Sequence, residues 1–105
     1  MYVNKHRSQE QIIADILSVV EKEPKKTHIM YGANLSYTLL CKYLDRLLGA
    51  GLVKYRRKDR VYELTNRGEH YLDRYGEYKT LEDALTQNES AFNEKKAALT
   101  EILEG

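Results

Sequence analysis

The sequence contains few of the residues that make covalent cross-links, metal sites or membrane spans. Its single cysteine, Cys41, cannot form an internal disulfide and cannot supply the several thiolates of a zinc site. No apolar run approaches the roughly 18 residues of a membrane-spanning helix. The first ten residues, MYVNKHRSQE, lack the apolar core of a signal peptide. We therefore expect a reduced, cytoplasmic protein.

Motifs of enzymes are also missing from the sequence. It contains no glycine-rich phosphate loop, no nucleophile elbow and no histidine and cysteine set with metal-ligand spacing. The three histidines, His6, His28 and His70, are scattered along the chain. One helical turn contains Glu69, His70 and Asp73. We interpret this cluster as the solvated start of a helix. We predict no catalytic activity, no metal and no cofactor.

The charge is unevenly distributed along the 105 residues, which suffice for one domain plus an appendage. Residues 1–67 contain 13 Lys and Arg against 7 Asp and Glu, a net charge of +6. Residues 68–105 contain 4 against 9, a net charge of −5. A basic part beside an acidic part suggests a module that binds a polyanion, with nucleic acid as the first candidate. A chance division of solvated charge is the alternative.

The first half of the chain shows helical periodicity. Ser8 is a good N-cap for a helix over residues 9–22, in which isoleucine, leucine and valine recur at helical spacing. Pro24 ends this helix, because proline disfavours helix in the residue before it. Thr27 is the expected cap of a short second helix over residues 27–33.

A third helix is predicted over residues 36–50, after a tight turn that ends at Asn34 and before a stop at Gly51. Its expected apolar face consists of Tyr37, Leu40, Leu44, Leu47 and Leu48. We also expect five tyrosines to lie in or beside the core, because they follow the apolar periodicities: Tyr31, Tyr37, Tyr43, Tyr55 and Tyr62.

The pattern then changes to the two-residue alternation of strands in LVKYRRKDRVYEL, residues 52–64, which predicts a β-hairpin. Its tip and first strand carry five cations within seven residues: Lys54, Arg56, Arg57, Lys58 and Arg60. Such a cluster can neutralise several phosphates. The alternative is that these charges protect the edge of the sheet from aggregation. Charges of either sign would serve that purpose equally well.

Three helices followed by a hairpin are the element order of a winged helix-turn-helix, which we predict as a mainly α fold over residues 1–67. Such domains place the third helix in the major groove of double-stranded DNA, while the hairpin contacts the backbone or minor groove. Besides the hairpin cations, the expected DNA contacts are Lys25, Lys26 and His28 before and in the second helix, and Asn34, Ser36, Thr38, Lys42 and Arg46 in the turn and third helix. No arginine near the start of this helix can read guanine, which predicts weak sequence specificity.

A final helix is predicted from Asn66 to Leu103, about 57 Å long at 1.5 Å per residue. Apolar residues recur in it every seven positions, which is typical of a coiled coil. Gly76 leaves open whether the helix continues or is kinked there. Residues 68–105 are therefore expected to form a dimerisation helix through Tyr71, Tyr78, Leu81, Leu85, Asn88, Phe92, Leu99 and Ile102.

Charge favours an antiparallel pair of these helices. In a parallel pair, Lys95 would face its own copy, whereas an antiparallel pair brings Lys95 and Lys96 toward Glu82 and Asp83. The antiparallel arrangement also layers apolar residues on each other.

The segments KKTHIMYGANLSYTLLCKYLDRLLGAGLV and LTNRGEHYL, on either side of the hairpin, resemble the archaeal ten-kilodalton winged-helix chromatin and regulator family. IMYGANLSY is the most specific part of this resemblance, which covers nearly the whole chain. The resemblance implies a homodimer with a C-terminal antiparallel coiled coil and DNA contacts from the third helix and the wing. It also implies an archaeal role in the nucleoid or in transcription regulation. The alternative function is a winged-helix module for protein–protein interaction.

Overall fold

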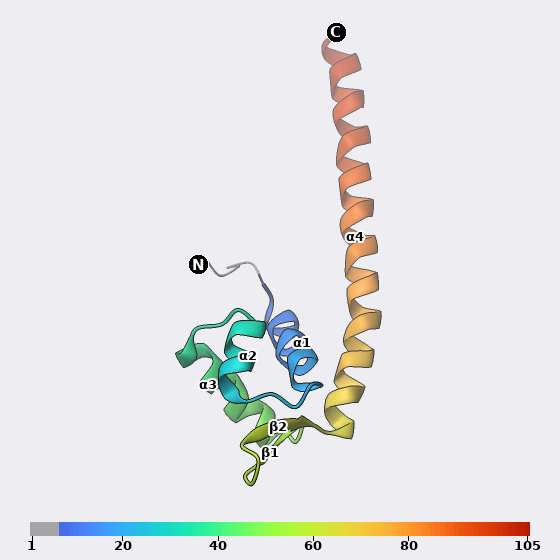
Figure 1. The fold of residues 1–105 in the computed structure, drawn as a ribbon. Coiled ribbons are helices and arrows are strands. Elements are labelled where there is room, and N and C mark those ends of the chain that lie inside the picture. Colours follow the sequence, from blue (N-terminus) through green and yellow to red (C-terminus); the bar gives the residue numbers. More distant parts are fainter. Residues whose placement is uncertain (1–6) are drawn as a thin grey trace. The chain divides into compact units, whose positions relative to one another are not determined.

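The computed structural model describes residues 7–105 and confirms the predicted fold, a mainly helical winged helix-turn-helix followed by a long C-terminal helix (Figure 1). The predicted first domain begins with residues 1–6, which lie outside the described residues together with His6. The elements in chain order are α1 (Gln9–Val20), α2 (Lys26–Gly32), α3 (Tyr37–Gly49), β1 (Val53–Arg56), β2 (Val61–Leu64) and α4 (Asn66–Glu104).

Two of the helix starts are capped by serine side chains. The Ser8 hydroxyl accepts a hydrogen bond from the Gln11 amide at 3.1 Å, as predicted, and Ser36 caps α3 in the same way. The predicted cap at Thr27 is wrong. Helix α2 starts one residue before Thr27. Its N-cap is Lys25, an extended residue that follows Pro24, and the Lys25 carbonyl accepts the first helical hydrogen bonds.

The turn between α2 and α3 uses a left-handed residue and a nearly buried cation. Asn34 has φ +55°, a conformation that asparagine tolerates better than most side chains. The Arg7 side chain donates hydrogen bonds to the carbonyls of Ala33 and Asn34 at 2.7 and 2.9 Å, and forms an ion pair with Asp15. Arg7 therefore connects α1 to the turn before α3, and its charge is used inside the domain.

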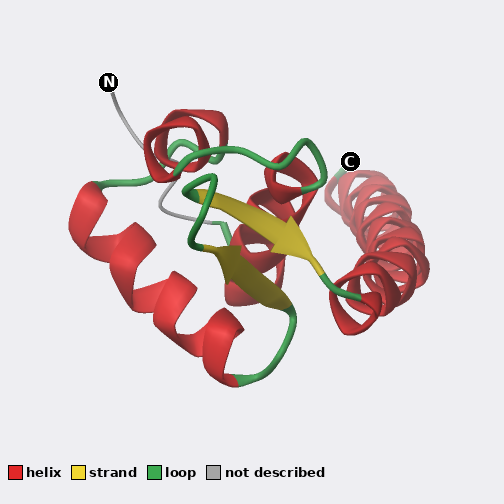
Figure 2. Cartoon of the chain, turned by 60° about the horizontal axis from the view of Figure 1, so that its bottom comes forward, coloured by secondary structure: helices red, strands yellow, loops and turns green. Residues whose placement is uncertain are grey.

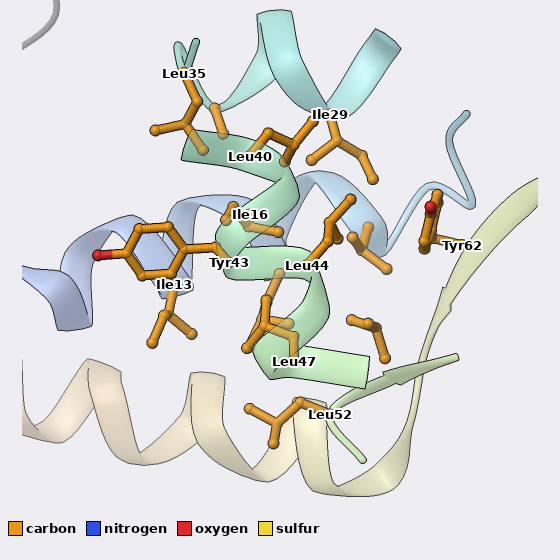
Figure 3. Packing of buried hydrophobic residues seen from close by; sticks show 14 residues of the cluster. Ile13, Ile16, Ile29, Leu35, Leu40, Tyr43, Leu44, Leu47, Leu52 and Tyr62 are labelled. Atoms are coloured by element: carbon orange, nitrogen blue, oxygen red, sulfur yellow. The ribbon is translucent and has the colours of Figure 1, made fainter. Parts of the chain in front are cut away.

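The core lies among the three short helices, the hairpin and the start of α4 (Figure 3). Ile16 and Leu17 of α1, Ile29 of α2 and Leu40 of α3 are fully buried. Burying each such side chain contributes roughly 1.5–3 kcal/mol to folding. The predicted apolar faces of α1 and α3 are thereby confirmed at most positions.

The tyrosines divide into two groups. Tyr43 and Tyr62 are buried in the core as predicted. Tyr31, Tyr37 and Tyr55 are 78, 60 and 44% exposed, so the prediction that all five lie in or beside the core is wrong for these three. Tyr37 is the first residue of α3, and its side chain contacts Lys26 instead of the core.

The hairpin is a two-stranded antiparallel sheet, and α3 packs against β1 (Figure 2). Tyr55 pairs with Tyr62, and Lys54 pairs with Glu63. Side chains of directly opposed residues lie on the same face of an antiparallel pair. Lys54 and Glu63 therefore share one face of the hairpin, and the two tyrosines share the other.

Helix α4 starts with a threonine N-cap and approaches the hairpin closely. The Thr65 hydroxyl accepts a hydrogen bond from the Gly68 amide and donates to the Leu52 carbonyl. A Cβ atom at Gly68 would lie 2.3 Å from the Leu52 carbonyl oxygen and 2.5 Å from a Leu64 methyl carbon. Only glycine fits here without a backbone shift, because the obstructing atom belongs to the main chain.

Helix α4 passes through Gly76 as one continuous helix. The described residues form two compact units, residues 7–75 and Gly76–Gly105. The first unit extends beyond residue 67, because Tyr71 and Leu72 pack against the core. Among the described helices, none is both long and apolar enough to cross a membrane.

Candidate nucleic-acid interface

The five predicted hairpin cations fall into two groups. Lys54 and Arg56 form ion pairs on one face of the hairpin: Lys54 lies 3.6 Å from Glu63, and Arg56 contacts Glu63 as well. Arg56 also lies 3.2 Å from Glu23 and 2.7 Å from Asp59. The hydrogen bond to Glu23, followed by the charges of the neighbouring carboxylates, raises the pKa of Arg56. Much of the positive charge of these two residues is therefore compensated within the domain.

The cations of the hairpin tip form the second group. Arg57, Lys58 and Arg60 are exposed, and within residues 7–105 they have no ion pair. Arg60 has φ +57°, and its amide donates to the Arg56 carbonyl at 2.8 Å, which closes the tight tip. These three side chains keep their charge available for an anionic ligand.

The start of α2 lies beside the hairpin. Lys25, Lys26 and Thr27 line the same groove as Arg60 and Tyr55. Three cations predicted from two separate segments, Lys25, Lys26 and Arg60, are thus brought together at one groove, and Arg57 and Lys58 belong to the same hairpin tip as Arg60. We call Lys25, Lys26, Arg57, Lys58 and Arg60 the basic surface.

Lys26 is held in place by α3. Its ammonium group lies 4.8 Å from the centroid of the Tyr37 ring and donates to the Tyr37 hydroxyl at 3.4 Å. Interaction with the Cys41 side chain, and then with the Tyr37 hydroxyl, raises the pKa of Lys26 above its ordinary value. Lys26 is therefore fully charged at neutral pH, in an orientation set by the first turns of α3.

The outer surface of α3 presents Thr38, Lys42 and Asp45 to solvent. His28 is exposed on α2. Of the two predicted contacts before α3, the Ser36 hydroxyl is used as the N-cap. Thr38 and Lys42 lie one helical turn apart on the same face, where they can reach base edges or phosphates.

Arg46 follows Lys42 one turn later on α3, but its side chain is bound to α1. Its guanidinium donates to the Gln9 side chain at 2.8 Å and lies 5.8 Å from the Tyr43 ring centroid. Gln9 is the first residue of α1, so Arg46 is directed toward that helix. The side chain can leave this position only by giving up the hydrogen bond to Gln9.

Two exposed rings beside the basic surface, Tyr37 and Tyr55, were missed from the sequence. Both follow the apolar periodicity of their elements, so the pattern assigned them to the core. The signal that could have identified them is position: Tyr37 directly follows the Ser36 cap, and Tyr55 lies two residues before the charged tip. Side chains at such ends are covered by few neighbouring elements.

The predicted dimerisation residues of α4 also differ in their surroundings. Tyr71 packs against the core and its hydroxyl lies 3.4 Å from the Glu10 carbonyl oxygen, so it belongs to the first unit. Asn88 is exposed, and Tyr78 is partly covered. We define the apolar face of α4 as the five residues at heptad positions that are at least 64% exposed: Leu81, Leu85, Phe92, Leu99 and Ile102.

Relatives of the chain are found in archaea. An uncharacterised protein of Methanocaldococcus jannaschii is 43% identical over 63 residues, which cover 59% of this chain and 63% of the relative. A second uncharacterised protein of that organism is 42% identical over 72 residues, which cover 68% of this chain and 33% of the relative. The chain thus spans less than two thirds of the length of these relatives.

A solved structure shares the fold along most of the chain. The crystal structure of Sso10a-2, a DNA-binding protein from Sulfolobus solfataricus, matches with a TM-score of 0.75 and 30% sequence identity. The match covers 84% of this chain and 95% of that protein. It confirms the resemblance to an archaeal winged-helix family that the IMYGANLSY segment indicated.

The winged helix-turn-helix family matches residues 6–83, which include every helix and strand of the first unit. This is a DNA-binding family and not a family of enzymes. The match, the element order and the charged hairpin agree, and the chain belongs to the winged helix-turn-helix family.

Proposed function

We propose that the chain binds double-stranded DNA through the basic surface and the exposed side of α3. The observation that carries this proposal is that Lys25 and Lys26 of one segment line the same groove as Arg60 of the hairpin tip, whose three cations have no acidic partner within residues 7–105. Phosphate contacts of this kind release counterions and supply affinity without base reading. The similarity to Sso10a-2, described as a DNA-binding protein, supports the same function.

In the proposed complex, the start of α3 enters the major groove and the hairpin tip contacts the backbone. Thr38 and Lys42 face the bases or the groove walls, while Asp45 keeps the second half of the helix away from phosphates. Lys54 and Arg56 contribute less, because their charges are paired with Glu63 and Glu23. Affinity then depends mainly on phosphates, which gives weak sequence specificity.

The cellular role proposed for this activity is that of a nucleoid protein or transcription regulator in the cytoplasm of an archaeon. No step of it needs a catalytic residue, a metal or a cofactor, and the lack of enzymatic activity stays a prediction.

We further propose that the protein is a homodimer formed by α4. The apolar face of α4 leaves five large side chains at least 64% exposed, and a contiguous apolar stripe of this size usually marks an interface. The heptad spacing identifies a second copy of α4 as the partner. Antiparallel pairing is favoured because it brings Lys95 and Lys96 toward Glu82 and Asp83 of the other copy.

The antiparallel dimer has a consequence for DNA. A helix of 39 residues is about 58 Å long, and an antiparallel pair carries one winged domain at each end. The two DNA contacts are then well separated, so the dimer is suited to distant sites or to two duplexes. Footprinting would contradict this arrangement if each dimer protected one compact site.

A salt titration tests the duplex proposal. The affinity of the full chain for a random duplex is measured as salt increases, with the natural sequence and with Arg57→Ala and Lys58→Ala combined. Each lost phosphate contact lowers the slope of log affinity against log salt by about 1, so the double variant should lose about 2. An unchanged slope would remove the hairpin tip from the interface.

The same titration separates duplex binding from the alternative function in protein–protein interaction. A chain without measurable duplex affinity at low salt, where phosphate contacts are strongest, would favour a protein partner.

A further inference from the structure

A groove of about 540 Å³ lies between the start of α2 and the hairpin. It differs from an ordinary phosphate contact because its lining combines cations with aromatic rings. The lining residues are Lys25, Lys26, Thr27, Tyr55, Arg60 and Tyr62.

The aromatic wall of the groove is a pair of tyrosines. Tyr55 and Tyr62 are directly opposed in the hairpin, and their ring centroids lie 4.8 Å apart at an interplanar angle of 48°. Tyr62 is buried, whereas Tyr55 is 44% exposed. The buried ring therefore holds the exposed one in place, and Tyr55 offers part of its surface to a ligand in the groove.

The cations of the groove are oriented as well. Lys26 is fixed over the Tyr37 ring at 4.8 Å, and that ring is itself 60% exposed. Arg60 is held at the closed tip of the hairpin by its backbone hydrogen bond. Lys25 and Arg60 have no ion pair within the described part of the chain. The groove thus presents two unpaired cations and a third that is oriented by an aromatic ring.

This combination fits an unpaired nucleotide better than a base-paired one. A duplex exposes its phosphates but hides the flat faces of its bases in the stack. A single strand exposes both, and proteins bind single strands by combining cations for the backbone with aromatic side chains for the bases. An aromatic wall next to three cations matches the two parts of an unpaired nucleotide.

We propose that the groove between α2 and the hairpin binds single-stranded DNA, with one base against Tyr55 and the adjacent phosphates on Lys25, Lys26 and Arg60. This goes beyond the proposed duplex binding, because the ligand and the aromatic contact are different. Three cations of the groove belong to the basic surface, so single-stranded and double-stranded DNA compete for the chain.

Replacement of Tyr55 in the full chain tests the proposal. The probe is an oligothymidine strand of about 15 nucleotides, which covers several nucleotides on either side of the groove and cannot pair with itself. Tyr55→Ala should weaken binding of this strand about tenfold, the usual scale of one lost stacking contact, and should change duplex affinity less than about twofold. Tyr55→Phe keeps the aromatic ring and should bind as the natural chain does.

Two further variants protect the test against loss of folding. Tyr55→Leu keeps apolar bulk beside Tyr62 but removes the aromatic face, and it should weaken single-strand binding as Tyr55→Ala does. Tyr31→Ala removes a tyrosine that is 78% exposed but does not line the groove, and it should have no effect. Circular dichroism of each variant reports on the fold.

Each outcome of the test supports or overturns the groove proposal. An equal loss of single-strand and duplex affinity in Tyr55→Ala would assign this ring to the duplex interface and overturn the proposal. No loss for either ligand, or a folded Tyr55→Leu variant with natural single-strand affinity, would also overturn it. A chain that binds the single strand through Tyr55 but shows no affinity for duplex would contradict the proposed function while supporting the groove.

Discussion

The two units of the chain differ in how their apolar side chains are covered. Residues 7–75 surround a core in which side chains such as Ile16, Leu17 and Leu40 are completely buried. Gly76–Gly105 is a helix whose large apolar side chains remain mostly exposed. The first unit thus buries its own apolar side chains, whereas the second leaves its apolar face exposed, and the proposed dimer would cover that face. Charge divides the sequence in a similar way, because the cations lie mainly before residue 68.

The largest expected effect in this comparison comes from the core of the first unit. Leu44→Ala removes a buried side chain of α3 and should lower the free energy of unfolding by about 3 kcal/mol, because the cavity is lined by neighbours that cannot fully relax. Leu48→Ala on the same helix, at a partly exposed position, is the matched control and should cost less than about 1 kcal/mol. Urea denaturation measures both, and equal losses would contradict the burial described for α3.

The next effect concerns the second unit. Leu81→Ala combined with Leu99→Ala removes two residues that would lie opposite each other in the proposed antiparallel dimer, and should weaken dimerisation about a hundredfold. Sedimentation equilibrium at several protein concentrations measures the change. Leu103→Ala is the control, since Leu103 is 86% exposed but lies outside the apolar face. A natural chain that is monomeric at micromolar concentration would contradict the dimer.

A smaller effect is expected at Gly76, the first residue of the second unit. Gly76→Ala places a methyl group where no described atom beyond the adjoining helix backbone lies within 4 Å, so no clash opposes it. Alanine favours helix over glycine by about 1 kcal/mol, and the variant should be more stable by up to that amount. Thermal unfolding followed by circular dichroism tests this prediction. A loss of stability would mean that the helix is not continuous through this residue.

The smallest effect is the dependence of stability on alkaline pH. Burial raises the pKa of Tyr62 above its ordinary value of 10.0, because the ionised phenol is poorly solvated in the core. A group with a raised folded pKa stabilises the fold below its unfolded pKa, and this contribution is lost as pH rises through the folded value. Stability should therefore decline above about pH 10, and less steeply in Tyr62→Phe. Identical declines would contradict this assignment.

Local patterns were sufficient to predict the fold. The spacing of Leu40, Leu44 and Leu47 identified the buried side of α3, and the serine at position 8 marked a helix start. These features depend on periodicity and capping, which are properties of a short segment. The tyrosine predictions failed where coverage by other elements decides burial. Tyr37 keeps the spacing of its helix, but its ring contacts Lys26 outside the core.

Features of the candidate site that depend on tertiary contacts could not be predicted. The pairing of Arg56 with Glu23 joins residues 33 positions apart, and its pairing with Glu63 depends on the register of the hairpin. Arg7 supports the turn before α3 from 26 residues away. The sequence therefore indicated where cations are numerous enough to bind DNA. It did not indicate which of these cations form ion pairs within the domain.

Duplex affinity is proposed to reside in the basic surface of the first unit. The most direct measurement compares two double variants of equal charge change: Arg57→Ala with Lys58→Ala in the hairpin, and Lys95→Ala with Lys96→Ala in α4. Affinity for a random duplex is measured at a series of salt concentrations, with sedimentation to verify the oligomeric state.

In the hairpin variant, the slope of log affinity against log salt should be smaller by about 2. The α4 variant should keep the slope of the natural chain and bind duplex nearly as well. Equal losses in both variants would show that affinity follows net charge alone, and would contradict a DNA interface located in the winged domain.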